Sequence, residues 1–450
     1  MLKNKYLVMK TILVFTALLF SSASFGLADD PGRLDQLAKE NKELREIVAK
    51  LSQKVEGLEG RVEKAEITPS TGGMVPATQT TAPVVEEDHG ILLTKGGNIY
   101  MDGFVDTSLN WNFATPNVAP GGTLATGNST VRAFDREADT FDLNNAQITF
   151  WRPAPDGGGV GFKTEFMYGT DAQVADSAGF TTTDEFAIQE AFVDIKIPIG
   201  SGLTVWAGKF ATLNGAEVIE NYLNWNSSRS LLFTNAIPFT HTGVRATYNW
   251  FEGKVQTCLG LINGWDNAID NNKDKDIEAM IKWVPNDNFW IGQNFVVGSQ
   301  IADDRSDNRW LFDTVAYWKP LPDSMPKLSL MANYDYGTEE RLGKISPTLE
   351  GGPADWQGYA LYARYELTDR ITLAARWEQF WDDQSVRVGT AERLWEMTYT
   401  ADFKVYDNLL TRLEYRHDHA DTNRLGTKTF DGGTDNMQDT IGASLIYMFG

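Results

Sequence analysis

Long hydrophobic runs, cysteine and basic residues are all scarce in this 450-residue chain. After the N-terminus no stretch approaches the ~20 apolar residues of a membrane-spanning helix, which argues against a helical membrane protein. The single cysteine, Cys258, rules out an internal disulfide and any Cys-x-x-Cys-His haem attachment site. The 40 basic residues are outnumbered by 61 acidic ones, and the net charge of −21 argues against nucleic acid as a partner.

The N-terminus has the features of a secretory signal over residues 1–28. Lys3, Lys5 and Lys10 precede or border an apolar stretch, and small residues follow up to Ala28. We expect cleavage after Ala28. The cleavage would remove three lysines and no acidic residue, so the formal charge would change from −21 to −24.

Residues 29–66 contain five regular heptads. The a positions are Leu34, Asn41, Val48, Val55 and Val62, and the d positions are Leu37, Leu44, Leu51, Leu58 and Ala65. This spacing predicts an α-helical coiled coil. The flanking g and e positions pair opposite charges in a parallel arrangement: Glu40 with Arg45, Lys54 with Glu59, and Arg61 with Glu66. Valine at a, leucine at d and one buried asparagine favour a dimer, whereas the membrane barrel that the rest of the chain predicts, as argued below, favours a homotrimer. We expect the trimer.

A linker rich in Pro, Thr and Ser is predicted for residues 67–96. From residue 97 to 450, apolar and polar residues alternate in short segments. The last segment, 441–449, places Ile441, Leu445 and Phe449 on one face. An apolar face repeated in this way, with charges opposite, is typical of a membrane barrel whose outside meets lipid and whose inside meets water.

Turn signals give the strand number. Short connections are predicted at 156–159, 200–202, 251–253, 285–287, 320–326, 368–370 and 406–408, with eight longer polar loops between them. Seven short and eight long connections join sixteen antiparallel strands, an even number with both ends on the periplasmic side. The predicted fold is therefore an all-β, 16-stranded outer-membrane β-barrel with a periplasmic coiled coil.

The charged residues on the inward face are expected to line a water-filled pore, because charge on the lipid face is costly. They are Asp102, Asp106, Lys163, Glu165, Asp194, Arg245, Arg364, Arg376, Glu378, Arg412, Glu414 and Arg416. The third long loop, residues 211–241, is the longest and carries an apolar stretch that would be costly to leave in water. We expect it to fold inward, with Glu217, Glu220 and Arg229 at a constriction.

Eight short motifs in the barrel point to a known family. They are 100–106, 132–135, 141–146, 189–192, 208–210, 228–233, 236–245 and 263–266. With these motifs in this order, the chain resembles the putative β-barrel porin-2 (OmpL-like) family. The resemblance implies an outer-membrane porin. It assigns no catalytic residue and names no solute.

Catalysis has little support in the sequence. The four histidines lie in no nucleophile-elbow or zincin motif, and we expect no cofactor and no metal site. Three functions are considered: a channel for passive diffusion of small polar solutes or ions, a tether that binds peptidoglycan through the coiled coil, and a sheath for a cytochrome partner. The channel is the preferred prediction.

Overall fold

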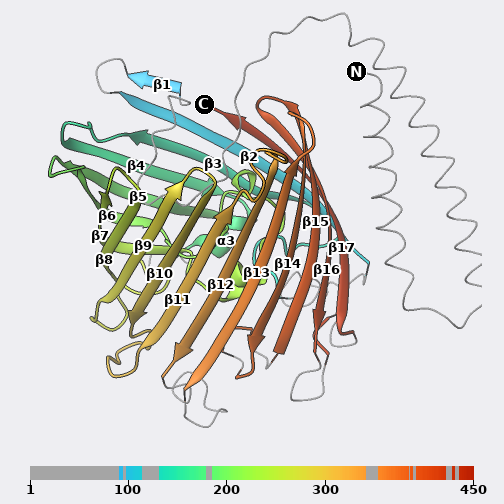
Figure 1. Ribbon diagram of the computed structural model, residues 1–450. Helices are drawn as coiled ribbons and strands as arrows, with labels where there is room; N and C mark the ends of the chain where they lie inside the picture. Colours follow the sequence, from blue (N-terminus) through green and yellow to red (C-terminus); the bar gives the residue numbers. More distant parts are fainter. Residues whose placement is uncertain are drawn as a thin grey trace, which may run out of the picture. The chain divides into compact units, whose positions relative to one another are not determined.

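The computed structural model describes residues 91–94, 98–113, 131–178, 185–340, 353–384, 386–388, 392–421, 428–430 and 435–450. The predicted signal, the coiled coil and most of the linker lie outside the described residues. The described strands form one antiparallel sheet that closes on itself (Figure 1).

Sixteen strands make the barrel wall. Each pairs with the next along the chain, and β17 pairs with β2 from Thr440 opposite Asn112 to Phe449 opposite Gly103. The strands are β2 (Ile99–Asn112), β3 (Thr140–Arg152), β4 (Gly159–Tyr168), β5 (Phe186–Ile197), β6 (Leu203–Ala211), β7 (Thr240–Trp250), β8 (Val255–Ile262), β9 (Asp276–Asn286), β10 (Phe289–Gly298), β11 (Arg309–Trp318), β12 (Leu328–Glu339), β13 (Ala354–Glu366), β14 (Ile371–Asp382), β15 (Glu392–Tyr406), β16 (Leu409–Ala420) and β17 (Met437–Phe449). The predicted count of sixteen is confirmed.

The alternation of short and long connections also agrees with the prediction. All seven predicted turns join consecutive strands, from the turn between β3 and β4 to the turn between β15 and β16. The eight longer connections lie at the opposite end of the wall, because antiparallel strands alternate in direction. Both ends of the wall, at Ile99 and Phe449, therefore lie at the end that carries the short turns.

A short additional strand, β1 (Ile91–Thr94), lies within the segment predicted as linker. It pairs antiparallel with the start of β2, with Ile91 opposite Met101. β3 pairs with one edge of β2, and along the other edge, the one that β1 uses, β17 ends at Phe449 opposite Gly103. β1 therefore supplies hydrogen bonds to a part of β2 that extends beyond the end of β17.

The two faces of the wall follow the predicted alternation. On β2, Asp106 and Asn112 are buried whereas Val105 and Trp111 are exposed. Large apolar side chains are exposed around the outside on many strands, among them Leu259, Ile281, Phe312, Leu361, Leu413 and Leu445. No helix among the described residues is long and apolar enough to cross a membrane. The exposed apolar face of the wall is the surface that suits lipid.

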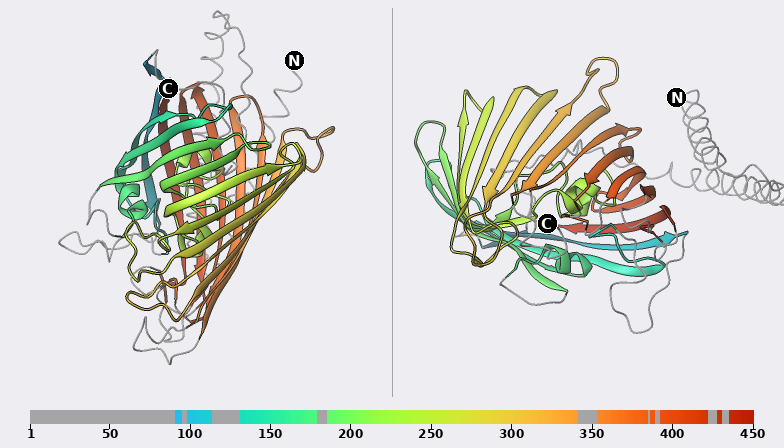
Figure 2. Two further views of the ribbon diagram at one scale, coloured as in Figure 1. Left: turned by 90° about the vertical axis from the view of Figure 1, so that its left-hand side faces the viewer. Right: turned by 90° about the horizontal axis from the view of Figure 1, so that it is seen from below.

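The connection between β6 and β7, residues 212–239, lies inside the barrel, and we call it L3. It contains the 3-10 helix η1 (Asn221–Leu223) and the helix α4 (Leu231–Asn235). Figure 2 shows α4 within the ring of strands. A third short helix, α3 (Thr170–Ala175), follows β4 and contacts β3 and β5. L3 therefore fills part of the lumen, as its apolar stretch predicted.

Candidate pore constriction

Apolar packing holds the second half of L3 inside the barrel. Leu231, Leu232, Phe233 and Ile237 are almost completely buried, and they belong to the largest hydrophobic cluster of the described chain. Removing such side chains from water contributes ~1.5–3 kcal/mol each. The Leu-Leu-Phe run therefore keeps L3 in the lumen, where a solvated loop would leave it exposed.

Carboxylates of the wall accept hydrogen bonds from the backbone of L3. Glu378 on β14 accepts from the N–H groups of Leu231 and Leu232, at 2.6 and 3.2 Å, and so caps the start of α4. Glu414 on β16 accepts from Ser227 and Ser228, at 2.6 and 2.8 Å. A loop inside a barrel has no strand partner, so its buried N–H groups need other acceptors. These two glutamates supply them.

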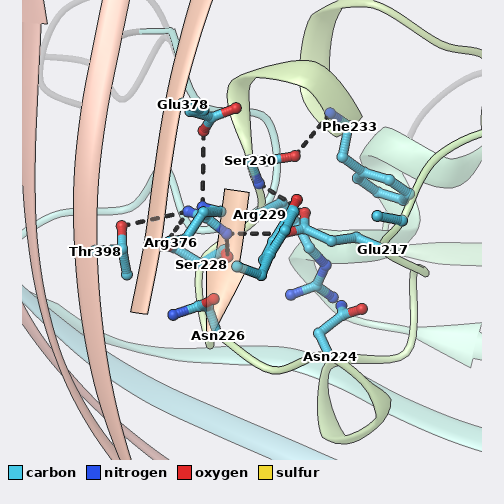
Figure 3. A network of polar contacts seen from close by, with 12 residues as sticks. Glu217, Asn224, Asn226, Ser228, Arg229, Ser230, Phe233, Arg376, Glu378 and Thr398 are labelled. Carbon is cyan, nitrogen blue, oxygen red and sulfur yellow. Dashed lines mark hydrogen bonds and ion pairs between the residues drawn. The ribbon is translucent and has the colours of Figure 1, made fainter. Parts of the chain in front are cut away.

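Arg376 on β14 joins L3 to two wall strands (Figure 3). Its guanidinium donates to Glu217 of L3 at 2.8 Å and to Glu396 of β15 at 2.7 Å. It also donates to the carbonyl oxygen of Ser228 at 2.6 Å. Arg376, Glu217 and Glu396 are all buried. Removing one member of such a buried group leaves the others uncompensated and costs ~3–5 kcal/mol.

Two further arginines on β16 bind carbonyl oxygens of L3. Arg412 donates to Asn221 at 2.8 Å and to Asn224 at 2.6 Å. Arg416 donates to the carbonyl oxygen of Arg229 at 2.6 Å. Arg229 itself donates to carbonyl groups within L3, including that of Val218 at 3.1 Å. The predicted constriction residue Arg229 therefore holds the shape of L3.

L3 also bridges the strand pair that closes the barrel. The side-chain amide of Asn221 donates to Asp106 on β2 at 2.8 Å. The hydroxyl groups of Ser227 and Ser444, on β17, lie 3.2 Å apart. β2 and β17 are thus joined by their own ladder and, from inside, by L3.

Glu220 differs from the other two predicted constriction residues because it is partly exposed. It accepts a hydrogen bond from Gln189 on β5 at 2.5 Å. Lys163 on β4, whose side chain is 35% exposed, bonds Glu165 and Glu190 on the same part of the wall. Carboxylates and one lysine thus meet where the edge of L3 approaches β4 and β5.

The predicted pore-lining residues all face inward, but most do not meet water. Nine are buried: Asp106, Glu165, Asp194, Arg245, Arg376, Glu378, Arg412, Glu414 and Arg416. Asp102, Lys163 and Arg364 keep partial exposure, and all three lie in the half of the wall next to the short turns. The expectation of a uniformly solvated inner face therefore needs revision. L3 bonds to six of the buried residues, Asp106, Arg376, Glu378, Arg412, Glu414 and Arg416, and the other three bond to residues of the wall.

The remaining predicted residues form local pairs on the wall. Arg245 makes two bonds of 2.9 Å to Glu278, and its guanidinium lies 3.9 Å from the ring centre of Phe210. Asp194 accepts from the indole of Trp206 at 3.2 Å. These contacts stiffen the wall beside L3.

Several residues of the interior were not predicted as site residues. Arg132, in the loop after β2, donates to Asp418 on β16 and to Thr440 on β17. Asp171, on α3, is buried near Arg229. Arg132 belongs to one of the family motifs, and this was its only sequence signal. Among the described residues no group of three or more histidine, cysteine or acidic side chains is arranged to hold a metal ion.

Residues 98–449 match the model of a protein family whose description is "Putative beta-barrel porin-2, OmpL-like". The chain belongs to this family. As a member of a porin family with a closed 16-stranded barrel, this porin is an outer-membrane channel protein. A search of the curated proteins found no match.

Solved structures similar to this porin confirm the fold. The outer membrane channel DcaP of Acinetobacter baumannii has 14% identity and a TM-score of 0.52, covering 80% of this chain and 100% of that one. An anion-selective porin from Comamonas acidovorans has 11% identity and a TM-score of 0.52, covering 78% and 99%. Salmonella typhi OmpF, in complex with daunomycin, has 12% identity and a TM-score of 0.52, covering 79% and 98%.

Proposed function

We propose that this porin forms a water-filled passage for passive diffusion of small polar solutes or ions, narrowed by L3. The observation that carries the proposal is the insertion of L3 into the lumen and its attachment to wall strands by Arg376, Glu378 and Glu414. A narrowed passage lined by charge admits small polar solutes and excludes large or apolar ones.

Within this passage we assign the selection between cations and anions to the edge of L3 that faces β4 and β5. Glu220 and Lys163 keep partial exposure there, whereas Glu217 and Arg229 are buried in bonds that hold L3. Three carboxylates, Glu165, Glu190 and Glu220, surround the single lysine. Their excess negative charge gives the passage a preference for cations.

Conductance of the purified full-length protein in planar bilayers tests the channel. We expect discrete current steps in KCl and, under a salt gradient, a reversal potential on the cation side. Glu220→Gln removes a carboxylate from the passage, and its matched control is Glu252→Gln in the exposed turn after β7, which removes the same charge outside the lumen and leaves selectivity unchanged. A folded barrel that inserts but passes no ions would refute the channel.

The assembly that we propose is a homotrimer in outer-membrane lipid, with the heptads of residues 29–66 in the periplasm; a dimer is the alternative that the heptads allow. The same heptads support a second role as a tether to peptidoglycan. Cosedimentation of the full chain with purified cell wall, compared with a chain lacking 29–66, tests the tether. The cytochrome sheath has less support, because L3 occupies space that such a partner would need.

A further inference from the structure

A small cavity lies between L3, β2, β17 and α3. Its volume is ≈ 20 Å³, and a water-sized group needs ~10–15 Å³ of such space. The charged side chains that line it are Asp106, Asp135, Asp171, Glu414, Arg132 and Arg229. Four carboxyl groups thus face two guanidinium groups, so the cavity wall carries net negative charge when all four are ionised.

Two of these carboxylates are already fully engaged. Glu414 accepts the backbone N–H groups of Ser227 and Ser228. Asp135 pairs with Arg132 at 3.0 Å. These bonds hold L3 and the loop after β2 in place, so neither carboxylate requires a further partner.

Asp106 and Asp171 are different. Asp106 is completely buried; its Oδ2 accepts from Asn221, but its Oδ1 has no hydrogen-bond partner in the described part of the chain. Asp171 is 4% exposed, and its ion pair with Arg229 is long, at 4.0 Å. The three nitrogens of Arg229 donate to carbonyl groups of L3, those of Val218, Ser227 and Ile219. These bonds use three of the five N–H donors of Arg229, and at 4.0 Å its guanidinium is too far from Asp171 for a hydrogen bond.

The pKa of Asp171, which lies outside the membrane-spanning strands, also reflects a buried carboxyl group without a close cationic partner. Burial raises the pKa of its carboxyl group well above the ordinary value, Arg229 opposes the rise, and Asp106 adds to it. A cation placed in the cavity would favour the ionised form. A buried carboxylate oxygen without a donor is costly. A small positively charged donor in the cavity would satisfy Oδ1 of Asp106 and pair with the carboxylate of Asp171.

We propose that this cavity is a subsite for the primary ammonium group of an amine-bearing solute. An ammonium group has three N–H donors and one positive charge, and it matches the cavity in size. The acceptors are Oδ1 of Asp106, the carboxylate of Asp171 and the hydroxyl oxygen of Ser108, which donates its own proton to Asn144 and keeps its lone pairs.

The inference rests on the proposed channel and narrows its solutes to amines. The test is calorimetric titration of the full-length protein in detergent with ethylammonium at constant ionic strength, and with tetramethylammonium, which has the charge but no N–H donor. We expect saturable binding of ethylammonium and at least ~10-fold weaker binding of tetramethylammonium.

Asp171→Asn removes the charge with little change of shape, and Asp171 accepts no hydrogen bond that its loss would break within the described chain. We expect ethylammonium binding to weaken about tenfold. Asp156→Asn, in the exposed turn after β3, is the matched control and leaves binding unchanged. Resistance of the folded barrel to SDS before heating confirms that each variant is folded.

Equal affinity for both cations, or unchanged affinity in folded Asp171→Asn, would overturn the subsite. Failure of the channel is seen separately in bilayers, since binding in detergent needs no conduction. A closed barrel that binds ethylammonium through Asp171 would refute diffusion and leave the subsite standing.

Discussion

Replacing Arg376 with methionine should loosen L3. The guanidinium donates to Glu217 and Ser228 of L3 and to Glu396 of the wall, and all of these groups are buried. Methionine keeps the apolar stem but removes the nearest positive charge from Glu217 and Glu396, and only Glu396 keeps a second arginine, Arg416, at 3.6 Å. The expected cost is ~3–5 kcal/mol. This raises the population of molecules with L3 displaced from the lumen by about 10²- to 10⁴-fold. The remaining bonds from Glu378 and Glu414 still hold most of the loop.

Single-channel recording measures the effect: Arg376→Met should show larger mean conductance and more frequent current fluctuations than the wild type. Arg393→Met is the matched control, because the side chain of Arg393 is exposed at the start of β15 and pairs with Asp383 at 3.0 Å. Adding Glu217→Gln to Arg376→Met removes one of the orphaned charges and should recover ~0.5–3 kcal/mol of thermal stability. Unchanged conductance and fluctuations in a folded Arg376→Met barrel would show that Arg376 does not hold the constriction.

Three further outcomes are expected. Glu220→Gln should move the reversal potential towards anions in dilute salt, and the shift should shrink as screening shortens to ~3 Å at 1 M; an unchanged potential would remove Glu220 from the passage. Gly337→Ala places a methyl group 2.1 Å from the ring of Trp356 and should lower the heat-modification temperature on gels at a cost of ~1–3 kcal/mol, whereas Gly157→Ala, in open space, should not. Sedimentation of the heptad segment should show self-association that Asn41→Leu alters in stoichiometry or strength; a monomer at high micromolar concentration would contradict the coiled coil.

The barrel was predictable because its signals are local. A turn such as 406–408 and the alternation around Trp395 and Glu396 depend only on neighbouring residues, and the structure has the turn and buries Glu396 on the inner face. The inward fold of L3 was predictable as well, because Leu231 to Phe233 could not remain in water at low cost.

The pairing inside the lumen was not predictable in the same way. Glu217 and Glu220 are three residues apart and of one type, yet the first is buried against Arg376 and the second is partly exposed. Which glutamate meets the arginine depends on the path of L3 and on the register of β14, and neither is written in the local pattern. Arg132 was missed for the same reason, since its partner Asp418 is 286 positions away.

The bridge that L3 makes between Asp106 and Ser444 has a consequence for biogenesis. These two residues lie on the first and last strands of the wall, so the inner contacts of L3 are complete only when the ends of the sheet have met. Sealing the cylinder and narrowing its bore are therefore coupled in free energy. A newly inserted barrel reaches its restricted bore as it seals, and the cell envelope is spared a wide, leaky intermediate.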